Sequence, residues 1–95
     1  MEESIKRVRL SIEGRVQGVG FRYFTVRKAK GLKEVTGWVK NEADGSVTVV
    51  AEGPKTELNK LIRNVAEGPR SARVDGMKQN WSEASGEFDS FKVKY

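Results

Sequence analysis

The sequence predicts an α+β sandwich in which two helices cover one face of an antiparallel sheet. Two segments have the period of amphipathic helices, and they are interspersed with segments of strand-like period in the order β-α-β-β-α-β. The pair Asp44-Gly45 tolerates the positive φ of a tight hairpin turn, so the two middle strands are expected to be antiparallel neighbours. A final aromatic segment predicts a short extra C-terminal strand. The length of 95 residues fits a single domain over residues 1–95.

The spacing of apolar residues defines the elements of the first half of the chain. Val8, Leu10 and Ile12 alternate with polar residues, which predicts a strand with one buried face. A glycine-rich loop and a helical pattern follow, and two strand-like segments then flank the Asp-Gly turn. The predicted elements are a strand Ile5–Glu13, a loop over 14–20, a helix from Phe21 to about Leu32, and strands Val35–Asn41 and Ser46–Glu52.

The second half begins with a clearly bounded helix. Apolar residues at i, i+3, i+4 and i+7 lie between Gly53-Pro54 and Gly68-Pro69, which open and close it. Two further strands are expected at about Ala72–Trp81 and Phe88–Tyr95, joined by a polar stretch over 82–87. Right-handed crossovers place the first and third strands in the centre of the sheet. The glycine-rich loop and the end of the second strand can therefore meet at one edge.

Composition limits the chemistry and the partners. The chain contains no cysteine and no histidine, which excludes disulfides, thiol nucleophiles, imidazole metal sites and histidine-based triads. With 18 basic and 13 acidic residues the net charge is +5, which favours an anionic partner without identifying it. The polar start Met1-Glu2-Glu3-Ser4 and the lack of any long apolar run predict a soluble, cytoplasmic protein that does not contact a membrane.

The loop between the first strand and the first helix has three features of an anion site. Gly18 and Gly20 allow successive amide N–H groups to turn inward, and the helix that follows adds its free N–H donors and the positive end of its dipole. Arg22 in the first helical turn can grip two phosphate oxygens with its planar guanidinium. The spacing is neither a Walker A loop nor a dinucleotide fingerprint. The alternative is an ordinary glycine-rich turn with Arg22 as surface charge.

Asn41, at the end of the second predicted strand, has two interpretations. An asparagine before a turn commonly caps that turn. Its carboxamide also offers an acceptor and two donors that do not titrate, which suits holding a water molecule against an electrophile. Such a reaction requires a substrate whose leaving group needs no protonation.

Four segments together resemble the acylphosphatases: Gly14-Arg15-Val16-Gln17-Gly18-Val19-Gly20-Phe21-Arg22, Gly37-Trp38-Val39-Lys40-Asn41, Asp44-Gly45-Ser46-Val47 and Glu52-Gly53-Pro54. The resemblance extends over nearly the whole chain. It implies a ferredoxin-like α/β sandwich that hydrolyses small acyl phosphates to a carboxylate and inorganic phosphate, without a metal, cofactor or covalent intermediate.

The resemblance also implies roles for individual residues. Arg22 and the loop amides bind the phosphoryl group of the substrate, or inorganic phosphate, and Asn41 orients the attacking water. The loop residues concerned are Gln17, Gly18, Val19, Gly20, Phe21 and Arg22. A monomer is expected.

The sequence departs from the family pattern at three places. Residues 31–35 carry one extra residue before the second strand, which affects the predicted end of the helix more than the site. Glu42 follows Asn41 where a neutral residue is common, and its charge would weaken phosphate binding if it faced inward. Gly20 stands where some members have a second aromatic residue, which is expected only to loosen the loop.

Two other kinds of function fit the same element order. An RNA-binding domain would suit the positive charge, but it needs aromatic residues on the central strands, and Ile5–Glu13 and Ser46–Glu52 contain none. No nucleic acid partner is therefore expected. A ligand-binding module without turnover would keep the fold and the anion pocket. The presence of both Arg22 and Asn41 favours the enzyme.

Overall fold

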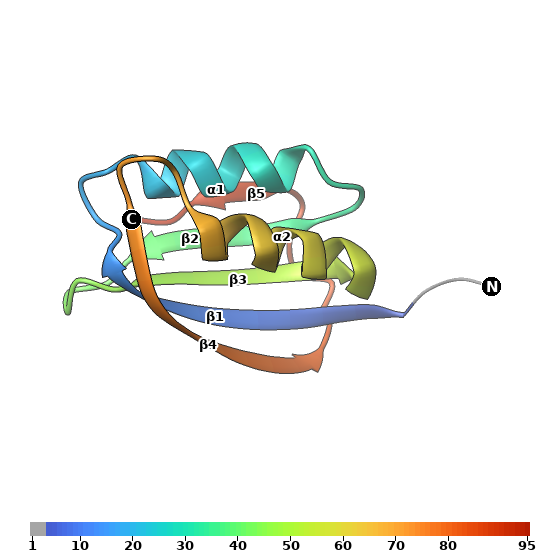
Figure 1. Cartoon of the computed structure of the whole chain (residues 1–95). Helices are drawn as coiled ribbons and strands as arrows, with labels where there is room; N and C mark the ends of the chain where they lie inside the picture. Colours follow the sequence, from blue (N-terminus) through green and yellow to red (C-terminus); the bar gives the residue numbers. More distant parts are fainter. Residues whose placement is uncertain (1–3) are drawn as a thin grey trace.

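A computed structural model describes residues 4–95, so the first three residues of the polar start lie outside the described residues. The elements appear in the predicted order, and both helices lie on one face of a five-stranded sheet (Figure 1). They are β1 (Ile5–Arg15), α1 (Phe21–Lys30), β2 (Thr36–Asn41), β3 (Val47–Pro54), α2 (Lys55–Glu67), β4 (Arg73–Glu83) and β5 (Phe91–Val93).

The sheet has the strand order β4-β1-β3-β2-β5, which confirms that β1 and β3 are central. The first four strands pair antiparallel, as the hairpin and the crossovers require. The short strand β5 differs, because it pairs parallel with β2, with Gly37 opposite Phe91 and Val39 opposite Val93. The sheet is therefore mixed, an antiparallel four-stranded sheet extended by one parallel edge strand, as in a ferredoxin-like α+β fold.

Most element boundaries differ from the predicted ones by only a few residues. α1 ends at Lys30 and not near Leu32, since Gly31 caps it by donating its amide hydrogen to the carbonyls of Arg27 and Lys28. In the connection that follows, Glu34 adopts a positive φ of 59°. β5 covers only residues 91–93 of the predicted 88–95.

The core lies between the sheet and the two helices. Side chains on the helix-facing side of the central strands are fully buried, and they pack against the apolar faces of α1 and α2. The main contributors are Val8, Leu10, Ile12, Val39, Val47, Val49, Phe21, Leu58, Leu61 and Val65. Burial of this kind contributes roughly 1.5–3 kcal/mol for each large apolar side chain. Across residues 4–95, neither helix has the length and apolar character needed to cross a membrane.

Candidate active site

The loop between β1 and α1 and the end of β2 lie together at one end of the sheet (Figure 1). They enclose a small pocket of about 130 Å³. Its lining residues are Val16, Gly18, Gly20, Phe21, Arg22, Tyr23 and Asn41. Four of the six predicted loop residues and Asn41 therefore share one pocket, although β2 and the loop are separated in the sequence by all of α1.

The path of the backbone leaves N–H donors free at the pocket. Gly18 and Gly20 have φ angles of 72° and 77°, in the left-handed region that glycine adopts without strain. Gly20 is the N-cap of α1, no side chain caps the helix, and its first turn contains no acidic residue. The first N–H groups of a helix have no intrahelical acceptor, and the dipole adds roughly half a positive charge there. This end of α1 favours an anion.

Arg22 contributes a guanidinium to the same pocket. It is half-buried in the first turn of α1, and its guanidinium carbon lies 5.4 Å from the ring centre of Tyr95. None of the ion pairs found within residues 4–95 involves Arg22. No carboxylate within the described residues therefore neutralises its positive charge, and a phosphate can accept two parallel hydrogen bonds from the N–H edge of the guanidinium while Tyr95 lies on its face.

Asn41 ends β2 on the same face of the sheet as Val39, which is the face that the helices cover. Its Oδ1 atom is buried, and it accepts no hydrogen bond from any residue in the described part of the chain. A buried acceptor without a partner costs roughly 1–3 kcal/mol. The turn after β2 is capped by Asp44, whose Oδ1 accepts hydrogen bonds from Ser46 N at 2.9 Å and Ser46 Oγ at 2.6 Å. The turn therefore does not use the Asn41 acceptor.

Gln17 and Val19 do not line the pocket. The Gln17 side chain donates from Nε2 to the backbone carbonyls of Glu42 at 2.8 Å and Ser46 at 2.9 Å, which ties the loop to the β2–β3 hairpin. Val19 packs against the core, and its carbonyl accepts a hydrogen bond from Ser71 Oγ at 3.1 Å. These two residues can reach an anion only through their amides.

Glu42 is not among the pocket-lining residues either, so the structure does not turn its carboxylate inward. Three residues at the site were not among the predicted site residues. Val16 and Tyr23 line the pocket, and Tyr95 packs on Arg22. Tyr23 could have been found because it follows Arg22 directly in the helix. The contact of Tyr95 depends on the parallel pairing of β5, for which the sequence carries no local signal.

The sequence model of the acylphosphatase family matches residues 8–93, which include both the loop and Asn41. The chain belongs to the acylphosphatase family. Membership places it among the hydrolases of acyl phosphates.

Individual relatives agree with this assignment over nearly the whole chain. The chain is 56% identical to an acylphosphatase of Salinibacter ruber, over 94% of this chain and 93% of that protein. It is 48% identical to an acylphosphatase of Arthrobacter sp., over 94% of this chain and 81% of that protein. Among solved structures, the acylphosphatase from Bacillus subtilis matches with a TM-score of 0.90 and 36% identity, over 95% of this chain and 99% of that one.

Proposed function

We propose that this acylphosphatase hydrolyses the carboxyl-phosphate bond of small acyl phosphates by direct attack of water, with Arg22 and Asn41 as its catalytic residues. The observation that carries the proposal is the pocket at the start of α1. It combines a helix N-terminus with an arginine and a buried acceptor that have, within residues 4–95, no carboxylate partner and no donor respectively. These are the groups needed for a phosphoryl anion and a water molecule.

The phosphoryl group binds between the Arg22 guanidinium and the amides of residues 17–22. Positive φ angles at Gly18 and Gly20 support this assignment, because such angles allow successive backbone N–H groups to turn inward around an anion. The transition state of phosphoryl transfer spreads negative charge over three equatorial oxygens. Donors already fixed around those oxygens stabilise that charge with little reorganisation, which is the largest catalytic effect available to a site of this kind.

The attacking water donates a hydrogen bond to Asn41 Oδ1. Support comes from the burial of this atom and its lack of any other donor among residues 4–95. The water supplies both the missing hydrogen bond and the nucleophile. A carboxylate leaves readily from the phosphorus, so no general acid is required and the absence of histidine and cysteine is no obstacle.

All the proposed groups come from one chain, which supports a monomer as the acting unit. Inorganic phosphate is the proposed product, and it also competes with the substrate for the same donors. A metal-independent reaction is proposed because Arg22 and the helix N-terminus already supply positive charge at the phosphoryl group. Cytoplasmic location remains a prediction.

The decisive test is hydrolysis of acetyl phosphate and benzoyl phosphate with a chelator present, followed as loss of the anhydride. We expect turnover well above the spontaneous rate and competitive inhibition by inorganic phosphate, since substrate and product share the same donors. The variant Arg27→Lys is the matched control, because Arg27 lies on an exposed position of the same helix. Loss of anhydride at the spontaneous rate, with phosphate still bound, would identify a binding module without turnover.

A further inference from the structure

The mouth of the pocket carries more aromatic surface than phosphate binding requires. Tyr23 lines the pocket and is 69% exposed, and Tyr95 is 85% exposed. They are two of only four large hydrophobic side chains that are exposed in residues 4–95. Both lie next to Arg22: Tyr23 follows it in α1, and the Tyr95 ring packs on its guanidinium.

The position of Tyr95 follows from the pairing of β5. Val93 lies opposite Val39, and Lys94 N donates to Val39 O at 2.8 Å, so the chain continues alongside β2 toward Asn41. Figure 1 shows the end of the chain beside the tip of β2 and the start of α1. Backbone hydrogen bonds therefore bring Tyr95 beside Arg22, so its exposed ring lies next to a pocket-lining residue without lining the pocket itself.

The shape of the pocket determines where the rest of a substrate must go. Its inner wall consists of Val16 and Phe21, which are almost fully buried, and of the end of β2. Its volume of about 130 Å³ leaves little room beyond a phosphoryl group and a water molecule. The acyl group of a bound acyl phosphate therefore projects outward, past the exposed ring of Tyr23.

We propose that Tyr23 and Tyr95 form a subsite for the acyl group, and that the protein favours acyl phosphates with a planar aromatic acyl group over those with a small aliphatic one. The inference rests on the proposed function, which places the phosphoryl group at Arg22. Flat rings contact one another in offset or edge-to-face arrangements, and a Tyr95 ring already packed on a guanidinium loses little freedom when a second ring joins it. An acetyl group has no ring with which to make such contacts.

The test compares benzoyl and acetyl phosphate in wild type, Tyr23→Ala, Tyr23→Phe, Tyr95→Ala and Trp81→Ala. The measured quantity is the ratio of kcat/KM for the two substrates, which cancels general losses of activity. We expect Tyr23→Ala and Tyr95→Ala each to lower the benzoyl preference roughly five-fold, which corresponds to one aromatic contact. Tyr23→Phe keeps the ring and should keep the ratio.

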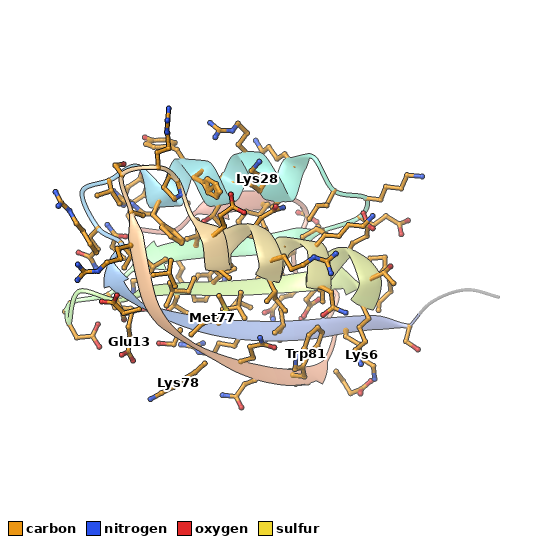
Figure 2. All side chains as sticks on the ribbon, in the orientation of Figure 1. Lys6, Glu13, Lys28, Met77, Lys78 and Trp81 are labelled. Atoms are coloured by element: carbon orange, nitrogen blue, oxygen red, sulfur yellow. The ribbon has the colours of Figure 1, made fainter. Side chains whose placement is uncertain are left out.

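Trp81→Ala is the matched control for loss of an exposed aromatic ring. Trp81 lies in β4, opposite Val8 of β1. Figure 2 shows it near Lys6, at the far end of the sheet from Glu13 and the loop that follows. Its ratio should equal that of the wild type. An equal loss of activity on both substrates in Tyr95→Ala would instead mean that this ring only positions Arg22, which would overturn its part in the subsite.

Binding of the non-hydrolysable benzoylphosphonate and acetylphosphonate, measured by calorimetry, separates the subsite from turnover. We expect tighter binding of benzoylphosphonate in wild type and a reduced difference in Tyr23→Ala. Equal affinity for the two ligands in a protein that hydrolyses acetyl phosphate would overturn the subsite and leave the proposed function intact. A benzoyl preference in binding without any hydrolysis would refute the proposed function and support the subsite.

Discussion

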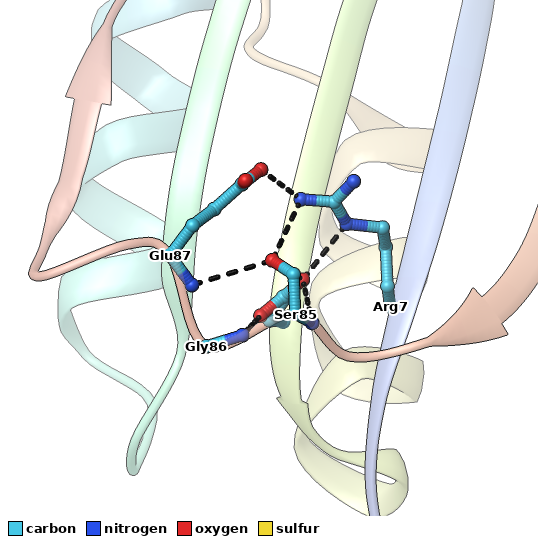
Figure 3. Close-up of polar contacts among 5 residues, drawn as sticks. Arg7, Ser85, Gly86 and Glu87 are labelled. Atoms are coloured by element: carbon cyan, nitrogen blue, oxygen red, sulfur yellow. Dashed lines mark hydrogen bonds and ion pairs between the residues drawn. The ribbon is translucent and has the colours of Figure 1, made fainter.

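Two regions of the molecule offer the same kinds of hydrogen-bond donor to an anion. In one of them the anion is a side chain of the protein, the carboxylate of Glu52. The Glu52 carboxylate, on the helix-free face of β3, accepts hydrogen bonds from Arg7 Nε and Ser85 N, both at 2.8 Å, and from Gly86 N at 2.9 Å (Figure 3). Ser85 Oγ donates a fourth hydrogen bond at 3.0 Å. Arg7 also pairs with Glu87. The result is a buried carboxylate held by an arginine and two successive amides.

The loop between β1 and α1 offers an arginine and amides in the same way, but none of the carboxylates described in the chain pairs with Arg22. The two regions lie at opposite ends of β3, near Glu52 and near Val47, which is opposite Asn41. The Glu52 region fastens the β4–β5 connection to the sheet and so supports the path of β5. On the proposed function, similar donors stabilise the fold where the anion is a side chain of the protein and bind a ligand where it is not.

The pKa of Glu52 reflects this internal arrangement. Burial raises the pKa of the carboxyl, but hydrogen bonds from the amides of Ser85 and Gly86, the Ser85 hydroxyl and Arg7 outweigh that effect. The net result is a pKa below the ordinary value of 4.5. The donors of this region are therefore arranged for the charged form of Glu52.

The largest effect is expected from changing Arg22, the arginine beside the loop between β1 and α1. Arg22→Lys should lower kcat/KM roughly 100- to 1,000-fold and weaken inhibition by phosphate, because a point charge cannot replace two parallel N–H donors. Steady-state kinetics measure both quantities, with Arg27→Lys as control. Wild-type kinetics in Arg22→Lys would remove Arg22 from the site.

Asn41→Ala should lower kcat about 100-fold while phosphate still inhibits, because the contact with water matters mainly in the transition state. Its stability should not fall, since Asn41 Oδ1 makes no hydrogen bond within the described chain that the change would remove. Kinetics and a denaturation midpoint on one preparation test both statements. Retained kcat with a stability loss of roughly 1 kcal/mol would mean that Asn41 acts as a turn cap.

Glu52→Gln should show the opposite pattern, with stability lowered by about 2 kcal/mol and phosphate binding retained. The matched control is Glu83→Gln, because Glu83 is exposed and pairs with Lys6 at 2.8 Å on the surface. It should change stability by less than about 0.5 kcal/mol. Chemical denaturation of the three proteins measures the difference. Equal losses in the two variants would contradict the distinction between a buried and a surface pair.

The stability of the protein should also depend on pH through the ionisation of Glu52. Because the folded-state pKa of Glu52 is lowered, its contribution is fully present above pH 4.5 and is lost as the pH falls through the folded-state pKa. Hydrogen bonds from Ser46 lower the pKa of Asp44, and a hydrogen bond from Lys60 lowers that of Glu57, so both add to the same slope. Denaturation midpoints between pH 2 and 6 should fall less steeply in Glu52→Gln than in wild type. Parallel curves would refute the role of Glu52.

The smallest effect is expected from Gln17→Ala, which removes two hydrogen bonds that join the loop to the hairpin. Stability should fall by about 1 kcal/mol, and kcat should fall several-fold because Arg22 and Asn41 are less well fixed relative to each other. Gln79→Ala, at an exposed position of β4, is the control. An unchanged kcat in Gln17→Ala would show that catalysis does not depend on these two hydrogen bonds between the loop and the hairpin.

The sequence predicts those features of the fold and the site that leave a local pattern. Alternation at Val8, Leu10 and Ile12 predicted a strand, and glycines at 18 and 20 before a helix predicted the loop that now lines the pocket. Crossover handedness predicted that Asn41 would reach that loop. The contact between Arg7 and Glu52 joins residues 45 positions apart, and neither residue differs locally from an ordinary surface charge. The parallel pairing of β5 depends on the path of residues 84–90, which the Glu52 contacts determine.

The hydrogen bonds of Gln17 also link the dynamics of two segments. When the 42–46 turn opens by local unfolding, the carbonyls of Glu42 and Ser46 are withdrawn from Gln17 Nε2, so the loop between β1 and α1 loses its support at the same moment. The amides of both segments should then exchange with solvent as one cooperative unit. Because apparent affinity scales with the fraction of molecules in the closed state, we expect the turn to affect the proposed phosphate binding without touching the ligand.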